Sequence, residues 1–104
     1  MDKKQALEVA EKYAQIVAKE FDPKKVMLFG SYLDGTPHEL SDIDIAVIFD
    51  EYNDNLWDAE ARLGMICMEI KNYDIEPHLM ELNHDTSGFA HHVQKTGKLL
   101  YQKT

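Results

Sequence analysis

The chain has 104 residues, which is enough for one domain with one modest hydrophobic core, and we expect a single domain over residues 1–104. Apolar residues make up 44% of the sequence and charged residues 29%, as is typical of a soluble globular protein. No apolar run approaches the roughly 18 to 20 residues of a membrane span, and the polar start differs from a signal peptide. We therefore expect a cytoplasmic protein with no membrane partner.

The formal net charge is −8, from 19 acidic and 11 basic residues, and Arg62 is the only arginine. Proteins that hold nucleic acid through its phosphates need basic patches, so this composition argues against nucleic acid as a partner. Cys67 is the only cysteine, which excludes an internal disulfide and a zinc site made of several thiolates. Its apolar neighbours in the sequence indicate inert core packing.

The first predicted element is an amphipathic helix over residues 1–21, because apolar residues recur there at spacings of three and four. Asp22 and Pro23 end it. Tyr13 lies on the apolar stripe and is interpreted as a core residue rather than a catalytic one. A short apolar strand over residues 25–29 follows and ends at Gly30.

Residues 30–41 form a connection rich in turn signals. At Gly30, backbone N–H groups can approach a ligand with no Cβ in the way. If Ser31 opens a short helix, its hydroxyl and the first N–H groups of that helix form a cradle for a phosphate. Ser41 either contacts a metal or substrate or caps the turn into the next strand.

The second strand, residues 42–49, begins with two aspartates and continues as an unbroken apolar run, which predicts a central strand buried on both faces. Side chains alternate along a strand, so Asp42 and Asp44 are expected on one face. Two carboxylates so placed can share a divalent cation. Together with a phosphate cradle at Gly30 and Ser31, they describe a nucleoside triphosphate site that depends on Mg²⁺.

Residues 56–71 return to helical spacing, with Asp54 or Asn55 as the N-cap. The third strand, residues 73–82, comes next, and the order strand, helix, strand predicts a right-handed parallel crossover. Pro77 cannot donate to a ladder, which places this strand at an edge of the sheet.

The C-terminal part is predicted as a polar loop over residues 83–87, a helix over residues 89–95 and a short strand over residues 98–101. Ser87 is the candidate N-cap of that helix, and Gly97 its C-terminal stop.

The third strand carries Asp74, Glu76 and His78 on one face, and Asp74 and Glu76 both qualify as a third metal-binding carboxylate. His78 has two readings: it orients a carboxylate or a phosphate, or it is a surface histidine, which is the commoner outcome. The adjacent residues His91 and His92 point apart on a helix and are interpreted as solvated.

A family resemblance rests on Gly30-Ser31, Gly35 and the run Ser41-Asp42-Ile43-Asp44. This pattern resembles the signature of the DNA polymerase β-type nucleotidyltransferase superfamily, and the short length resembles its minimal nucleotidyltransferase branch. The resemblance implies an α+β nucleotidyltransferase fold, with a three- to four-stranded mixed sheet and helices packed against it.

The resemblance also implies roles for residues. In the family, a carboxylate on the strand that follows the Asp-x-Asp strand completes the metal site and helps to deprotonate the acceptor. The Ile-Glu-Pro-His run resembles that strand in minimal members, which favours Glu76 over Asp74. Asp42, Asp44 and Glu76 would then hold two Mg²⁺ ions roughly 3.5 to 4 Å apart, and Gly30, Ser31 and Ser41 would contact the nucleotide.

Larger relatives bind the acceptor with an additional helical domain, for which this chain has no segment, so the acceptor is expected on another chain. Minimal nucleotidyltransferases are commonly paired with a small helical HEPN toxin, whose tyrosine they adenylylate as antitoxins. By resemblance, we expect Mg²⁺-dependent transfer of AMP from ATP to a hydroxyl of a HEPN-type partner.

Two alternatives stay open. A small-molecule acceptor would need a pocket that a homo-oligomer builds, and an antitoxin without catalysis would act by contact alone. The three carboxylates argue against the second alternative.

Overall fold

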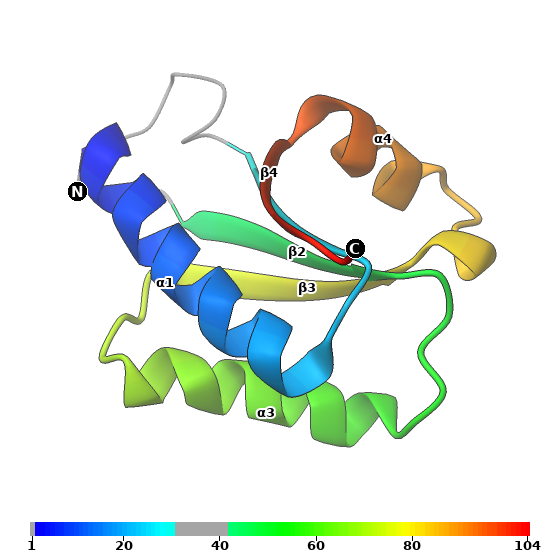
Figure 1. Ribbon diagram of the computed structural model, residues 1–104, viewed down its shortest axis with the longest axis horizontal. Coiled ribbons are helices and arrows are strands. Elements are labelled where there is room, and N and C mark those ends of the chain that lie inside the picture. Colours follow the sequence, from blue (N-terminus) through cyan, green and yellow to red (C-terminus); the bar gives the residue numbers. More distant parts are fainter. Residues whose placement is uncertain (1, 31–41) are drawn as a thin grey trace.

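The computed structural model describes residues 2–30 and 42–104, and over these residues a four-stranded mixed sheet carries helices on both faces (Figure 1). The first half contains α1 (Lys3–Phe21), β1 (Lys25–Phe29) and β2 (Ile43–Phe49). The second half contains α3 (Leu56–Glu69), β3 (Ile75–Glu81), the 3₁₀ turn η1 (Leu82–His84), α4 (Phe89–Thr96) and β4 (Lys98–Gln102). The expected α+β fold class is confirmed.

The strands lie in the order β3-β2-β1-β4. Strands β2 and β3 are parallel, whereas β1 is antiparallel to both β2 and β4. The apolar strand β2 is therefore central and its connection to β3 joins parallel strands, as predicted. Strand β3 lies at an edge of the sheet, as predicted. At an edge, the missing N–H of Pro77 costs no hydrogen bond to a further strand.

The two faces of the sheet have different roles. On one face, Ile43, Ile45 and Val47 of β2 are fully buried in the main core beneath α1 and α3. On the other face, Ala46 and Ile48 belong to a smaller cluster that α4 covers. Since side chains alternate along a strand, Asp44 shares the α4 face with Ala46 and Ile48.

Helices α1 and α3 are joined by a buried polar contact and an exposed one. The hydroxyl of Tyr13 donates to the Leu63 carbonyl at 2.8 Å, and burial raises the pKa of this phenol. Arg62 bridges Glu20 on α1 and Glu69 on its own helix. Tyr13 is thus a core residue as predicted.

Cys67 lies in the same core. Burial raises the pKa of its thiol, so the thiolate that would react is disfavoured. The prediction of an inert packing role for this cysteine fits its environment.

The helix ends agree only in part with the sequence. Asn55 caps α3 by accepting from the Asp58 N–H, as expected. At α4, the predicted cap Ser87 accepts only from the Phe89 N–H, at 3.2 Å, whereas Asp85 accepts from two later N–H groups, both at 3.0 Å. Asp85 lies on the segment predicted as loop, whose first part forms the 3₁₀ turn.

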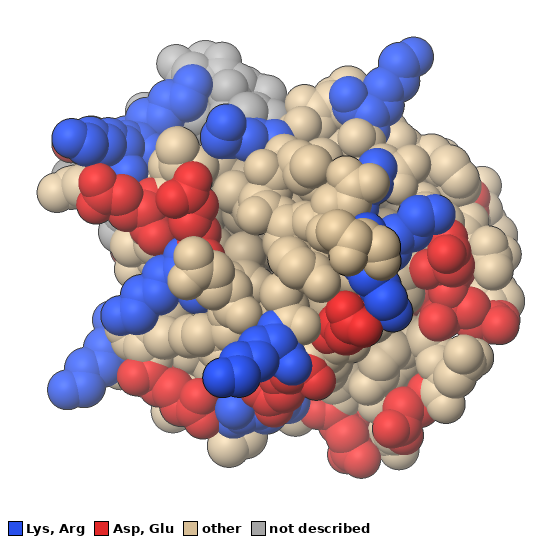
Figure 2. Space-filling view, viewed as in Figure 1, with Lys and Arg blue, Asp and Glu red and all other residues tan. Residues whose placement is uncertain are grey.

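Charges of both signs are interspersed on the face of the molecule seen in Figure 2, where the lysines do not merge into one basic surface among the described residues. Within the two described ranges, no helix combines the length and apolar character that crossing a bilayer requires.

Candidate active site

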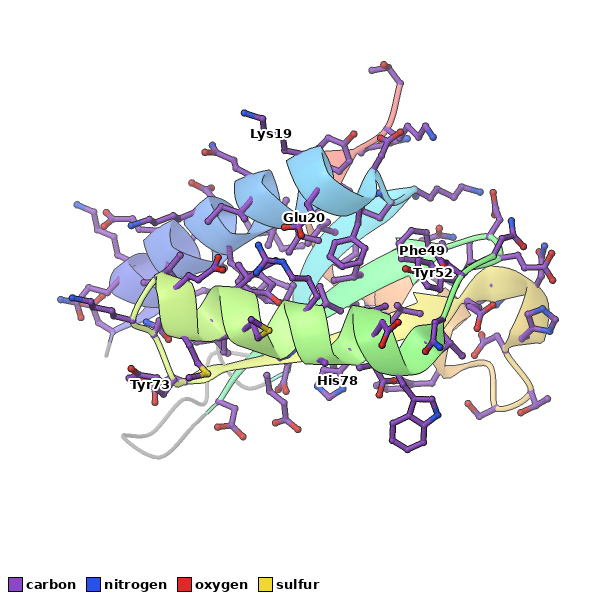
Figure 3. The ribbon with its side chains drawn as sticks, turned by 90° about the horizontal axis from the view of Figure 1, so that it is seen from below. Lys19, Glu20, Phe49, Tyr52, Tyr73 and His78 are labelled. Carbon is purple, nitrogen blue, oxygen red and sulfur yellow. The ribbon has the colours of Figure 1, made fainter. Side chains whose placement is uncertain are left out.

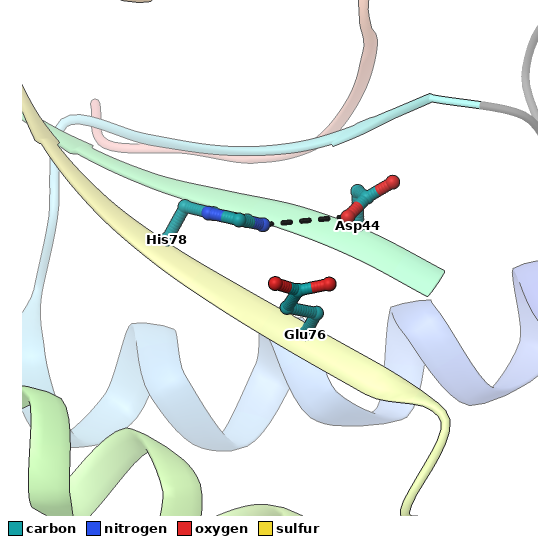
Figure 4. Close-up of side chains that lie close together, drawn as sticks. All are labelled: Asp44, Glu76 and His78. Carbon is teal, nitrogen blue, oxygen red and sulfur yellow. Dashed lines mark hydrogen bonds and ion pairs between the residues drawn. The ribbon is translucent and has the colours of Figure 1, made fainter. Parts of the chain in front are cut away.

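The parallel pairing of β2 with β3 brings acidic side chains together on the α4 face of the sheet. In the register, Asp44 lies opposite Glu76, and Ala46 lies opposite His78. One carboxylate oxygen each of Asp44 and Glu76 and one ring nitrogen of His78 lie within 4.8 Å of one another (Figure 4). The alternation read from the sequence puts each of these carboxylates on one face of its strand, and the register between β2 and β3 places them side by side.

Gly30 contacts this cluster directly. It has a φ of +86°, and a Cβ built on it would lie 2.3 Å from Oδ2 of Asp44, with Cγ and Cβ of Asp44 at 3.2 and 3.4 Å. A side chain at Gly30 would thus occupy the place of the Asp44 carboxylate. Glycine is therefore needed at this position to leave room for Asp44, in addition to giving a ligand access to the backbone. Asp44 lies this close because it pairs with Phe29 between β1 and β2.

Asp42 immediately precedes β2 and is exposed; it hydrogen-bonds with Glu76 but does not belong to the group formed by Asp44, Glu76 and His78. The pKa of Glu76 is raised above its usual value, first by its hydrogen bond with Asp42 and then by burial. The charge of His78 lowers this pKa, and the charges of Asp42 and Asp44 raise it further. Because these carboxylates repel one another, the cluster favours a bound cation.

His78 is part of the cluster, and its contact with Asp44 agrees with the first of its two readings, in which it orients a carboxylate. Its side chain is 35% exposed, and its Nε2 lies 3.3 Å from Oδ1 of Asp44. Phe29 of β1 packs against the imidazole, with ring centroids 5.3 Å apart, and Phe89 of α4 packs against Phe29 at 5.7 Å. Figure 3 shows His78 on the side of the sheet turned away from α1.

Other predicted residues lie apart from the cluster or outside the described residues. Asp74 is exposed, and its backbone carbonyl accepts from the Ile43 N–H at 2.7 Å, just before the two strands pair. Asp74 does not belong to the group formed by Asp44, Glu76 and His78. Ser31 and Ser41 lie outside the described ranges, as do Gly35 and the short helix expected after Gly30.

The two histidines of α4 are exposed, as predicted. His91 is exposed and pairs with Asp85 at 2.7 Å, and His92 is exposed on the same helix. His84 is exposed as well and pairs with Glu51 at 2.7 Å. Neither histidine of α4 belongs to the group formed by Asp44, Glu76 and His78.

Phe29 is the residue that sequence reasoning missed. It ends an apolar strand and looks like an ordinary core position, but it is half-buried beside the site. The sequence held one signal, the position of Phe29 directly before Gly30, whereas its pairing with Asp44 depends on the register between β1 and β2.

The described side chains fit a divalent cation. Asp44 and Glu76 offer hard carboxylate oxygens from adjacent strands, and Asp42 adds a third carboxylate beside Glu76. Such oxygens are the ligands that Mg²⁺ takes in phosphate-transferring sites.

The family model for polymerase beta nucleotidyltransferases matches residues 11–104. The chain belongs to this nucleotidyltransferase family. The matched segment contains Gly30 and both strands that carry the carboxylates, which agrees with the resemblance drawn from the sequence.

Two curated relatives refine the comparison. The chain is 34% identical over 86 residues to the protein adenylyltransferase MntA of Aphanizomenon flos-aquae, covering 77% of this chain and 57% of that protein. It is 46% identical over 46 residues to a relative from Methanocaldococcus jannaschii, covering 44% of this chain and 46% of that protein. The chain thus spans about half the length of these relatives.

A solved structure resembles the fold closely. It is a toxin-antitoxin crystal structure with AMP-PNP, 30% identical to this chain, with a TM-score of 0.62. The superposition covers 90% of this chain and 74% of the other. The nucleotidyltransferase fold inferred from the sequence is therefore confirmed.

Proposed function

We propose that this protein is an adenylyltransferase that moves AMP from ATP to a hydroxyl group, a tyrosine hydroxyl, on a HEPN-type toxin partner and thereby acts as its antitoxin. The observation that carries the proposal is the meeting of Asp44 and Glu76 across two parallel strands, with Gly30 against Asp44. Membership of the nucleotidyltransferase family and the adenylyltransferase relative support the reaction type.

In the proposed reaction, the acceptor hydroxyl forms a bond to the α-phosphorus of ATP, and the bond from that phosphorus to the leaving pyrophosphate breaks. Asp42, Asp44 and Glu76 would hold two Mg²⁺ ions, which would neutralise the charge of the triphosphate when bound. Glu76 takes the proton of the acceptor hydroxyl, which is the role that the resemblance gives to the carboxylate on the strand after β2. Gly30, Ser31 and Ser41 bind the phosphates. Because Gly30 has no side chain, it also leaves room for the Asp44 carboxylate.

The acceptor is proposed to come from another protein chain. The relative with AMP-PNP was crystallised as a toxin-antitoxin assembly, which supports a toxin as the partner here. The HEPN identity of the partner and its tyrosine rest on the resemblance of the sequence to minimal nucleotidyltransferases.

The test is a transfer assay with ATP labelled on the α-phosphate, Mg²⁺ and the product of the adjoining reading frame. We expect label on the partner with the wild-type protein and none with Asp44→Asn. Asp50→Asn is a matched control, because Asp50 follows the far end of the same strand and pairs with Lys24 at 2.9 Å. We expect this control to keep full transfer.

Three outcomes decide between the alternatives. A tight complex with the partner but no label in any sample would refute catalysis and favour an antitoxin that acts by contact alone. Label on a small hydroxyl compound, and none on the partner, would refute the protein acceptor. Glu76→Gln is expected to lose transfer and Asp74→Asn to keep it; the reverse would assign the third carboxylate to Asp74.

A further inference from the structure

A histidine nitrogen lies among the acidic side chains of the candidate active site. We propose that Nε2 of His78 is itself a metal ligand, so that the site prefers Mn²⁺ and similar transition-metal ions over Mg²⁺. This inference rests on the proposed function in that it concerns the metal of the same site, and it names a ligand beyond the carboxylates assigned above.

The hydrogen bond between His78 and Asp44 and the short distances within the cluster are compatible with ligation of one ion. With metal–ligand bonds of about 2.1 Å, octahedral geometry places neighbouring ligand atoms roughly 3.0 Å apart and opposite ones roughly 4.2 Å apart. Nε2 of His78 lies 3.3 Å from Oδ1 of Asp44, and the ligand atoms of the cluster all lie within 4.8 Å of one another. Relative shifts of up to about 0.6 Å would bring these atoms to one ion.

The fold aims the imidazole at this place. His78 lies opposite Ala46 in the register, and the small Ala46 side chain leaves room for the ring to extend across β2 toward Asp44. Phe29 packs on the ring at 5.3 Å and is itself supported by Phe89. These contacts restrict the orientations of the ring, which reduces the entropy lost when it binds a ligand.

A nitrogen ligand changes which ion the site selects. Mg²⁺ takes oxygen ligands almost alone, whereas imidazole is a good ligand for first-row transition metals. When Nε2 binds the metal, the ring proton is on Nδ1, so the neutral form of His78 is the ligand. A site of carboxylate oxygens with one imidazole should therefore hold Mn²⁺ more tightly than an all-oxygen site does.

The test compares metal binding by the wild-type protein and by His78→Gln, without nucleotide or partner. Glutamine keeps a group that donates a hydrogen bond to Asp44 but has no imidazole nitrogen, so it separates ligation from positioning. Affinities for Mn²⁺ come from the electron paramagnetic resonance signal of the free ion, and affinities for Mg²⁺ from competition.

We expect the wild-type protein to bind Mn²⁺ more tightly than Mg²⁺ and to show ¹⁴N modulation in the electron spin echo of bound Mn²⁺. We expect His78→Gln to abolish this modulation and to weaken Mn²⁺ binding by about tenfold or more, with Mg²⁺ binding changed much less. His92→Gln is the matched control. His92 is exposed on α4 and stacks on Phe89 at 6.4 Å between ring centroids, but it does not belong to the group formed by Asp44, Glu76 and His78.

Absence of ¹⁴N modulation in the wild-type protein, or equal losses of Mn²⁺ and Mg²⁺ affinity in His78→Gln, would overturn the proposal, as would lack of Mn²⁺ binding at millimolar concentration. The outcome is separate from that of the transfer assay. A protein that binds Mn²⁺ through His78 but transfers no AMP would refute the proposed function and leave this ligand assignment standing.

Discussion

Gly30 offers the sharpest test of the site, because replacing it with alanine should move one specific carboxylate. The new Cβ would lie 2.3 Å from Oδ2 of Asp44, and a contact of this kind must open to at least 3.0 Å. The oxygen would therefore move by at least 0.7 Å. This shift would take the Asp44 carboxylate out of the place that it shares with Glu76 and His78, so Gly30→Ala should bind metal much more weakly than the wild type.

Gly88→Ala is the control for the backbone effect. Gly88 has a φ of +78°, close to the +86° of Gly30, but a Cβ at Gly88 meets no atom within 4 Å. Both variants should be less stable than the wild type by about 1–2 kcal/mol, the cost of a left-handed conformation for an L-residue. Only Gly30→Ala combines this cost with a displaced Asp44.

The assay is thermal unfolding with and without Mg²⁺ or Mn²⁺. At a metal concentration 100 times Kd, binding stabilises a protein by about 2.7 kcal/mol. In a domain of this size, that corresponds to a Tm increase on the order of 10–20 °C. We expect this increase in the wild type and in Gly88→Ala, and little or none in Gly30→Ala. An equal increase in both glycine variants would refute the assigned contact between Gly30 and Asp44.

Three further predictions concern stability. Tyr13→Phe removes the buried hydrogen bond to the Leu63 carbonyl and should cost about 1 kcal/mol in urea unfolding, whereas Tyr101→Phe, with an exposed hydroxyl contact, should change little. Asp85→Asn should lower the Tm at neutral pH, because hydrogen bonds from N–H groups of α4 lower the pKa of Asp85 in the folded protein. Ionised Asp85 therefore stabilises the fold above its unfolded pKa, and this stabilisation is lost as the pH falls through its folded pKa. The difference between the Tm of Asp85→Asn and that of the wild type should therefore shrink in acid. Glu76→Gln should raise metal-free stability at neutral pH, because the raised folded pKa means that ionised Glu76 opposes folding. Two charges within 4.8 Å of each other in water repel by about 0.9 kcal/mol or more, and by less in salt. A lower stability of the variant would contradict this prediction.

The sequence predicted those parts of the fold that depend on local pattern. The apolar run after Asp44 has no polar position to turn to solvent, so a central strand follows from its composition, and β2 is central. Pro77 has no N–H to donate to a neighbouring strand, so its presence alone excluded β3 from the middle of the sheet. In the same way, the alternation along each strand predicted that Asp44 and Glu76 each share a face with the polar residues near them.

The prediction was weaker where a contact joins distant segments. His78 and a surface histidine have the same local sequence signal, and only the register between β2 and β3 puts the ring beside Asp44. Ser87 is a good N-cap by its residue type, but the path of the chain after η1 brings Asp85 to the free N–H groups of α4. Side-chain chemistry alone does not rank two neighbouring caps.

Residue types and their spacing determined the family, the sheet-forming segments and the candidate carboxylates, because these depend on periodicity and on a motif of a few residues. The tertiary structure decided which groups meet. Gly30 and Asp44 are far apart in the chain and touch because β1 and β2 pair in one register, and His78 joins them because β3 pairs in another. A shift by one residue in either register would turn these side chains to the opposite face, and burial of the apolar face selects the register that assembles the site.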